Sequence, residues 1–226
     1  MAAPRTRQYV PDAGDESDIS PWVLPAVPDT GVPGTGLWRQ VFGNDAPVEI
    51  EVGCGKGTFL LQAALRAPTR NFLGLERAPR LAVVAERAIA AAGLTNARVL
   101  LCDAGCVVPH LIPARSVAIY HLYFPDPWWK RRHHKRRVYT GRFAAAITRT
   151  LASDGRVYVA TDVPPLLDLI RERFAHAGLV VLPASPPAPR TVFARRCREE
   201  GRALHEAAFG PRSLTHGRSM DEIDIA

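Results

Sequence analysis

The stretch VEIEVGCGKG at residues 48–57 joins a short strand pattern to a glycine-rich turn. Apolar β-branched residues mark the strand over 48–52, and glycines follow it at 53, 55 and 57. The apolar spacing after Gly57 predicts a helix that runs to about Arg66. Glycine permits positive φ angles and lets a backbone approach a ligand closely. A strand, a glycine turn and a helix in this order predict a ligand-binding turn in an α/β fold.

Strand and helix patterns continue beyond this turn. Helical spacing recurs between strand-like stretches, which predicts a mostly parallel, doubly wound α/β sheet. A turn is expected at Asp154-Gly155. The strands are predicted at 48–52, 71–75, 98–101, 116–124, 157–160, 191–195 and 203–209, and the helices at 57–66, 81–92, 143–151 and 164–177.

The ends of the chain have a different composition from its middle. Prolines and glycines recur through residues 1–46 without a period, which predicts an irregular N-terminal arm. One domain is expected over 47–212, followed by a polar tail at 213–226. No apolar run approaches the roughly 18 residues of a membrane span, and we see no signal-peptide pattern. The four cysteines lack zinc-ligand spacing, so we expect no metal, and free thiols in the reducing cytoplasm. We also expect a monomer or homodimer.

The positive charge of the chain is concentrated in one place. The 226 residues include 29 Lys and Arg against 22 Asp and Glu, a net charge of +7. Most of this excess comes from the run KRRHHKRR at residues 130–137. Such a run is often only a solvated surface, but it also suits contact with the phosphates of a nucleic acid.

Acidic residues are expected at the ends of the next two strands. Glu76 ends the second strand, where a carboxylate can accept two ribose hydroxyls, and Asp103 ends the third, within reach of an adenine amino group. The spacing GxGxG disfavours a dehydrogenase, because dinucleotide-binding turns have a glycine at the position of Thr58. Together with Glu51, the turn resembles the loop that binds S-adenosylmethionine. Glu51 could instead cap nearby backbone amides.

A rigid acidic loop directly precedes the basic run. Asp126 lies between two prolines, which fix the backbone and remove amide donors. A carboxylate held at the end of the fourth strand is well placed to meet an acceptor molecule. The tryptophans at 128 and 129, followed by cations, suit base stacking and phosphate contact.

These motifs together resemble the bacterial tRNA (guanine-N7)-methyltransferases over roughly residues 48–177, with a weaker likeness over 191–209. The matching residues are Glu51-Val52-Gly53-x-Gly55-x-Gly57, Phe72-x-Gly74-x-Glu76, Cys102-Asp103-Ala104, Phe124-Pro125-Asp126-Pro127-Trp128, Lys130-Arg131, His133, Lys135-Arg136-Arg137 and Ala160-Thr161-Asp162. The resemblance implies a Rossmann-like class I methyltransferase with a mostly parallel doubly wound sheet and an antiparallel C-terminal strand. It also implies S-adenosylmethionine as cofactor and the guanosine at position 46 of the tRNA variable loop as acceptor.

The resemblance assigns roles to individual residues. It implies that Asp126 is catalytic, and that tRNA contacts come from Lys130, Asp162 and Thr191. The residues it places on the methyl donor are Glu51, Gly53, Gly55, Gly57, Glu76, Asp103 and Asp126.

The sequence departs from the family pattern in three places on the acceptor side. Ala194 stands where the family usually has glutamate, Trp129 stands where histidine or proline is common, and residues 8–20 are acidic where the family is basic. Two alternatives therefore stay open. One is a methyltransferase for a small purine-like or heterocyclic molecule, and the other is a non-catalytic RNA-binding protein on a methyltransferase fold. The basic run favours tRNA, and the acids at 76, 103 and 126 favour an enzyme.

Overall fold

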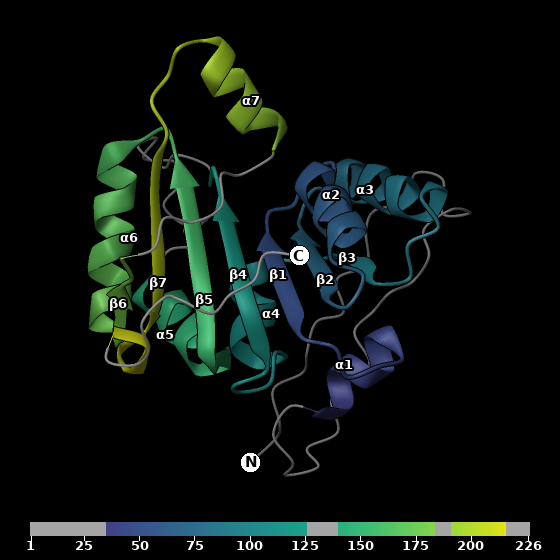
Figure 1. Cartoon of the computed structure of the whole chain (residues 1–226), viewed down its shortest axis with the longest axis horizontal. Helices are drawn as coiled ribbons and strands as arrows, with labels where there is room; N and C mark the ends of the chain where they lie inside the picture. The colour runs from purple at the N-terminus through teal and green to yellow at the C-terminus, as the bar shows by residue number, and fades with distance from the viewer. Residues whose placement is uncertain (1–34, 126–139, 184–190, 216–226) are drawn as a thin grey trace, which may run out of the picture.

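A computed structural model describes residues 35–125, 140–183 and 191–215. These residues form a seven-stranded sheet in the order β3-β2-β1-β4-β5-β7-β6, with helices on both faces (Figure 1). The strands are β1 (Val48–Val52), β2 (Asn71–Glu76), β3 (Ala97–Leu101), β4 (Val117–Tyr123), β5 (Leu151–Thr161), β6 (Leu179–Val181) and β7 (His205–Pro211). The helices are α1 (Thr35–Phe42), α2 (Thr58–Arg66), α3 (Pro79–Ala91), α4 (Ala104–His110), α5 (Gly141–Thr150), α6 (Pro164–His176) and α7 (Val192–Glu199), with a short 3₁₀ turn η3 (Arg212–Thr215).

The sheet has the predicted mixed topology. Strands β1 to β5 pair in parallel, and β7 runs antiparallel to both β5 and β6. The order reverses direction between β1 and β4, since the chain moves outward from β1 to β3 and then returns to the other side of β1. In an open α/β sheet, ligands bind beyond the carboxyl ends of the strands at such a reversal.

Two apolar cores lie on opposite faces of the sheet. Helices α2 and α3 pack on one face over β2 and β3, with Leu60, Phe72, Ala85 and Val99 at their contact. Helices α1, α4, α5 and α6 contribute to the larger core on the other face. All residues of β1 and β2 are buried, as expected for central parallel strands.

The predicted irregular arm is wrong for its last part. Residues 35–42 form helix α1, and four of its apolar side chains join the larger core. Trp38 is buried, and its Nε1–H donates to the carbonyl of Ser116 at 2.9 Å. The prolines and glycines earlier in the arm led us to miss this short amphipathic helix. The helix is stabilised because its apolar face packs into the core.

The predicted turn at Asp154-Gly155 is also wrong, since both residues lie within β5. Val117 pairs with Leu151, but Ile119 pairs with Arg156, so β5 carries additional residues at a register shift. A Cβ at Gly155 would come within 2.8 Å of the Leu151 side chain, so the glycine permits close packing at the irregularity.

The expected strand at 191–195 is the third error, because residues 192–199 form helix α7. Thr191 precedes the helix, and its hydroxyl accepts the N–H of Ala194 at 2.9 Å, which caps the first turn. The apolar residues at 192 and 193 suggested a strand, but they begin a short exposed helix. The structure also adds α4 and β6, which were not predicted, while the strand expected at 203–209 is confirmed as β7.

Two features are absent from the described ranges. No helix in them is long and apolar enough to cross a membrane. Within the same ranges, no three His, Cys, Asp or Glu side chains are grouped as a metal site would need.

Candidate active site

The carboxyl ends of β1, β2 and β3 are tied together by backbone hydrogen bonds. The N–H of Gly53, after β1, donates to the carbonyl of Leu75 at 2.7 Å, and the N–H of Cys102 donates to the carbonyl of Glu76 at 2.8 Å. The predicted acids at the ends of these strands therefore lie along the carboxyl edge of the sheet, which is the edge nearer α7 in Figure 1.

The three glycines of the turn have different functions. All have positive φ angles, 77° at Gly53, 57° at Gly55 and 73° at Gly57, which favour glycine. A Cβ at Gly57 would lie 2.8 Å from the Cβ of Ala85, so this glycine lets α2 pack on α3. At Gly53 and Gly55 a Cβ would meet nothing within 4 Å. The first two glycines therefore leave the outer side of the turn open to a ligand.

Glu76 holds the glycine turn against the end of β2. Its Oε2 accepts the N–H of Gly55 at 2.8 Å, and its Oε1 accepts the N–H groups of Arg77 and Ala78 at 2.9 and 2.8 Å. Each carboxylate oxygen can accept two hydrogen bonds, so one position, on Oε2, remains for a ligand. The side chain is nearly buried, which orients that capacity.

Glu51 lies beneath the turn with one oxygen unsatisfied. The backbone N–H of Leu60, in the first turn of α2, donates to the carboxyl group. Glu51 therefore does cap one backbone amide, as the alternative interpretation of this residue expected. Within the part of the chain that the structure describes, its Oε2 is buried and has no hydrogen-bond partner. Burial, reinforced by the negative charge of Glu76, raises the pKa of Glu51 well above its usual value. A buried orphan acceptor of this kind is satisfied by a polar or cationic ligand group.

Asp103 lies at the end of β3 and begins α4. Its Oδ1 accepts the N–H of Gly105 at 2.8 Å and so caps the helix. The residue is exposed at the same edge as Glu76 and the glycine turn. An open acceptor at this place can contact a ligand that lies along the edge.

The other half of the edge is built by β4, β5 and α7. Asp162, directly after β5, forms an ion pair with Arg202, which also donates to Glu200 at 2.8 Å. The guanidinium of Arg202 lies 5.1 Å from the ring centre of Phe193, and that ring packs 4.7 Å from the ring of Phe124. This stack connects α7 to the end of β4.

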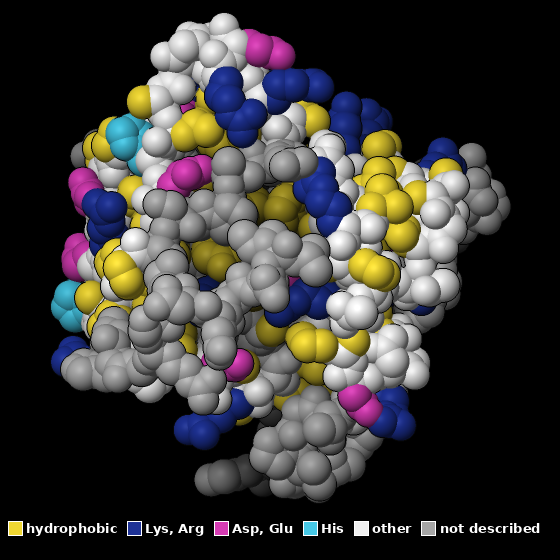
Figure 2. Space-filling view, in the orientation of Figure 1, with side chains coloured by type: hydrophobic (Ala, Val, Ile, Leu, Met, Phe, Trp, Pro, Cys, Tyr) yellow, Lys and Arg dark blue, Asp and Glu magenta, His cyan; other side chains and the backbone are white. Residues whose placement is uncertain are grey.

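The predicted tRNA-contacting residues are only partly brought together. Asp162 and Thr191 both lie near α7, Asp162 paired with Arg202 and Thr191 as the helix cap. Asp126 and Lys130, with the whole basic run, lie outside the described residues. Figure 2 shows Lys and Arg side chains over and beside α7, at the edge that carries the site.

A buried polar cluster beside the edge was not predicted. Glu49 on β1 accepts a hydrogen bond from His121 on β4 at 2.7 Å, and His121 also contacts the hydroxyl of Tyr123 at 3.0 Å. The signal in the sequence was the alternation of polar residues at 49 and 51 and at 121 and 123, within strands that are otherwise apolar. Alternate residues of a strand share one face.

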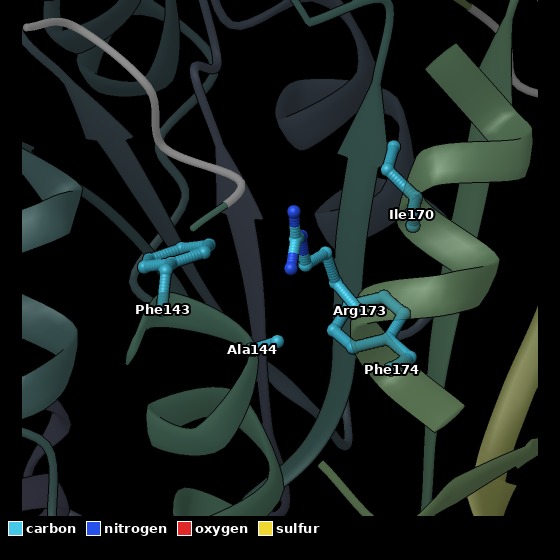
Figure 3. A pocket seen from close by; sticks show the side chains of 5 residues that line it. All are labelled: Phe143, Ala144, Ile170, Arg173 and Phe174. Carbon is cyan, nitrogen blue, oxygen red and sulfur yellow. The ribbon is translucent and has the colours of Figure 1, made fainter. Parts of the chain in front are cut away.

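A small hollow elsewhere in the molecule lies between α5 and α6. Its lining is Phe143, Ala144, Ile170, Arg173 and Phe174 (Figure 3). None of the acids at the strand ends lines it, and apart from Arg173 the lining is apolar. It represents incomplete packing between two helices, and it is separate from the site.

Comparisons with known proteins identify the family of this chain. Residues 45–206 match the model of a protein family described as "Putative methyltransferase". The tRNA (guanine-N(7)-)-methyltransferase of Vibrio cholerae serotype O1 is 36% identical over 182 residues, which cover 76% of each chain. The protein of the same name from Psychromonas ingrahamii is 38% identical over 182 residues, 80% of this chain and 71% of that one.

Solved structures support the fold. The aminoglycoside resistance methyltransferase NpmB1 has a TM-score of 0.57 at 17% identity and covers 79% of this chain and 93% of its own. The 16S rRNA methyltransferase KamB gives the same values. These likenesses confirm the Rossmann-like class I methyltransferase fold. The matches in sequence show that the chain belongs to the tRNA (guanine-N7)-methyltransferase family.

Proposed function

We propose that this protein transfers the methyl group of S-adenosylmethionine to N7 of guanosine 46 in tRNA. The observation that carries the proposal is the alignment of Glu51, Glu76 and Asp103 with the open glycine turn along one sheet edge. Membership in the family adds the acceptor, and it favours an enzyme over a non-catalytic RNA-binding protein. Because tRNA is the substrate, we expect the protein to work in the cytoplasm.

The residues at the edge fit the methyl donor. Glu76 has one acceptor position left, on Oε2, for a ribose hydroxyl, and Asp103 is exposed where an adenine amino group would lie. The open sides of Gly53 and Gly55 allow close approach, and the orphan oxygen of Glu51 can accept from a cationic group. S-adenosylmethionine supplies an electrophilic methyl group on a positively charged sulfur.

The acceptor requires alignment more than proton transfer. Guanine N7 carries an in-plane lone pair and is already nucleophilic, so no strong base is needed. The protein must hold N7 in line with the methyl group, which is a matter of orientation. The purine becomes cationic during transfer, so a carboxylate at its edge stabilises the transition state more than the ground state. We assign this role to Asp126, with Lys130, Asp162 and Thr191 on the tRNA.

The departure from the family at Ala194 has a structural explanation. Thr191 caps α7, and Ala194 is the third helical residue, where a glutamate would complete a capping box. Ala194 is fully buried, so its side chain is not on the open surface. The substitution therefore changes a helix cap, and it gives little support to a small-molecule acceptor.

The experiment that tests the proposal is methyl transfer to a tRNA transcribed without modifications, followed by nucleoside analysis. We expect 7-methylguanosine, and we expect it to disappear when guanosine 46 of the tRNA is replaced by adenosine. A protein that binds S-adenosylmethionine but leaves the tRNA unmethylated would contradict the proposed acceptor and favour a small heterocyclic molecule. A different methylated nucleoside would contradict the proposed atom.

A further inference from the structure

The cluster around His121 is a hydrogen-bonded chain that starts at a buried ion pair. Arg70 donates to Oε1 of Glu49 at 2.7 Å, and His121 Nε2 lies 2.7 Å from Oε2 of the same carboxylate. Glu49 and His121 are both nearly buried, at 7% and 3% exposure. Burial alone would raise the pKa of Glu49, but the hydrogen bond from His121 and the charge of Arg70 bring it below its usual value. Glu49 is therefore an ionised carboxylate that only accepts hydrogen bonds.

This charge sets the direction of the remaining hydrogen bonds. Because Glu49 can only accept, Nε2 of His121 must carry the proton. A neutral imidazole with its proton on Nε2 is an acceptor at Nδ1. The hydroxyl of Tyr123 lies 3.0 Å from Nδ1, and it donates to that nitrogen in this neutral form of His121. The O–H of Tyr123 is thereby occupied, and the lone pairs of its oxygen stay available to another group.

Aromatic packing holds the chain in this arrangement. The ring of Phe59 lies 4.6 Å from that of His121 and 5.0 Å from that of Tyr123, in an edge-on contact with the tyrosine. Tyr158 on β5 packs 5.8 Å from His121. Phe59 belongs to the first turn of α2, directly after the glycine turn. The cluster thus lies between the glycine turn and the end of β4.

Tyr123 shares a face of the sheet with the orphan carboxyl oxygen. Glu51 pairs with His121 across β1 and β4, and Tyr123 follows His121 by two residues, so all three side chains point to one face. Burial raises the pKa of Tyr123, so the side chain remains a phenol. Two acceptors without a full set of donors, Glu51 Oε2 and the Tyr123 oxygen, lie at the ends of neighbouring strands. A cation beside them would interact favourably with the Tyr123 oxygen and would favour the ionised form of Glu51.

We propose that the oxygen of Tyr123 contacts the sulfonium end of S-adenosylmethionine, and that Glu49 and His121 are positioning residues that keep its lone pairs turned to that charge. Tyr123 ends the strand that leads to the acceptor loop, so it lies on the side where the methyl group must face the acceptor. The by-product S-adenosylhomocysteine has a neutral sulfur and loses this attraction. The cluster therefore makes the site prefer the methyl donor over its by-product. The inference rests on the methyl donor and is independent of the acceptor.

The test compares the two ligands in binding assays without tRNA. Tyr123→Phe keeps the ring and its packing on Phe59 but removes the oxygen. We expect calorimetry to show S-adenosylmethionine bound about tenfold more weakly, which is about 1.4 kcal/mol, with S-adenosylhomocysteine nearly unchanged. Equal weakening of both ligands, or no change in either, would overturn the proposal.

Two substitutions of His121 distinguish a role in orienting the Tyr123 hydroxyl from a role in packing alone. His121→Asn places an amide oxygen close to the former position of Nδ1, so it keeps an acceptor for the hydroxyl of Tyr123. His121→Gln keeps a donor toward Glu49 but removes that acceptor, so the tyrosine hydroxyl can turn its proton toward the site. We expect the selectivity between the two ligands to fall in His121→Gln and to be largely retained in His121→Asn. The same selectivity in both variants would overturn the positioning role.

The matched control is another buried tyrosine on the same strand. Tyr120 lies on the opposite face, and its hydroxyl contacts the Thr150 hydroxyl at 2.7 Å. Tyr120→Phe removes a comparable buried hydrogen bond and should leave the ligand selectivity unchanged. Thermal unfolding of each variant confirms that it is folded before binding is compared. Since no tRNA enters these assays, a failure here and a failure to methylate tRNA are distinguishable.

Discussion

The carboxylate of Glu76 accepts the backbone N–H of Gly55 at 2.8 Å, which fastens the glycine turn after β1 to the end of β2. These residues are 21 positions apart in the chain. The same carboxylate also accepts hydrogen bonds from the backbone N–H groups of the first two residues after β2. One side chain thus shapes the turn and presents its remaining acceptor capacity to the ligand.

Loss of this carboxylate should weaken binding of the methyl donor. We expect Glu76→Ala to reduce the affinity for S-adenosylmethionine by roughly 1.5–3 kcal/mol, the cost of losing hydrogen bonds to a charged group. Calorimetric titration measures the change. Glu172→Ala, at an exposed position on α6, is the control and should bind normally. Unchanged affinity in Glu76→Ala would remove this residue from the site.

Glu51 should destabilise the ligand-free protein at neutral pH. Its pKa is raised in the folded protein, so the folded state keeps the proton while the unfolded state releases it above about pH 4.5. Stability is therefore lost as the pH rises through the unfolded value. Glu51→Gln resembles the protonated form and should melt higher than the natural protein at pH 7, by about 2–4 °C for each 1 kcal/mol recovered. Thermal unfolding between pH 4 and 8 tests this, and the difference should shrink toward pH 4.

Helix α1 should contribute to the stability of the domain. Trp38 is buried and donates to the carbonyl of Ser116, 78 residues away. We expect Trp38→Ala to lower the free energy of unfolding by about 3–5 kcal/mol, the usual cost of deleting a large buried aromatic side chain. Denaturant unfolding measures it, with the exposed Gln40→Ala as control. Equal stability of the two variants would mean that α1 is not part of the folded core.

The basic run at 130–137 should supply affinity for tRNA and little of the chemistry. Replacing Arg131, Arg132, Arg136 and Arg137 with alanine should flatten the dependence of tRNA affinity on salt, by roughly one unit of slope for each phosphate that the protein no longer neutralises. Filter binding across a salt series gives the slope. The control removes an equal charge from helices α2, α3 and α6 through alanine at Arg66, Arg87, Arg171 and Arg173. If both variants behave alike, the run is an ordinary solvated surface.

Asp126 should act on the chemical step. Asp126→Asn keeps the shape and removes the charge that we assign to stabilising the cationic purine. We expect the single-turnover rate at saturating S-adenosylmethionine to fall about a hundredfold or more, as for other preorganised electrostatic contacts. Affinity for the donor, measured separately, shows whether the carboxylate also holds the cofactor. A normal chemical step would leave Pro125-Asp126-Pro127 with the role of a rigid turn.

Local sequence was sufficient to predict the glycine turn, the acids at the strand ends and the alternating order of strands and helices. Each depends on residues within one strand and the turn that follows it. Glycine at 53, 55 and 57 is required by the local φ angles, and apolar periodicity distinguishes helix from strand over a few turns. The family resemblance depends on these same short motifs.

The tertiary structure decided the features that depend on distant partners. Thr191 to Arg195 looked like a strand, yet the Thr191 cap and the Phe124–Phe193 contact accompany a helix. Asp154-Gly155 looked like a turn, yet both residues lie within β5, between Leu151 and Arg156, which pair with β4. The bond between Glu49 and His121 joins positions 72 apart. Such contacts form only when the sheet brings β1 and β4 side by side, so the alternating polar residues in each strand do not by themselves specify which partner they meet.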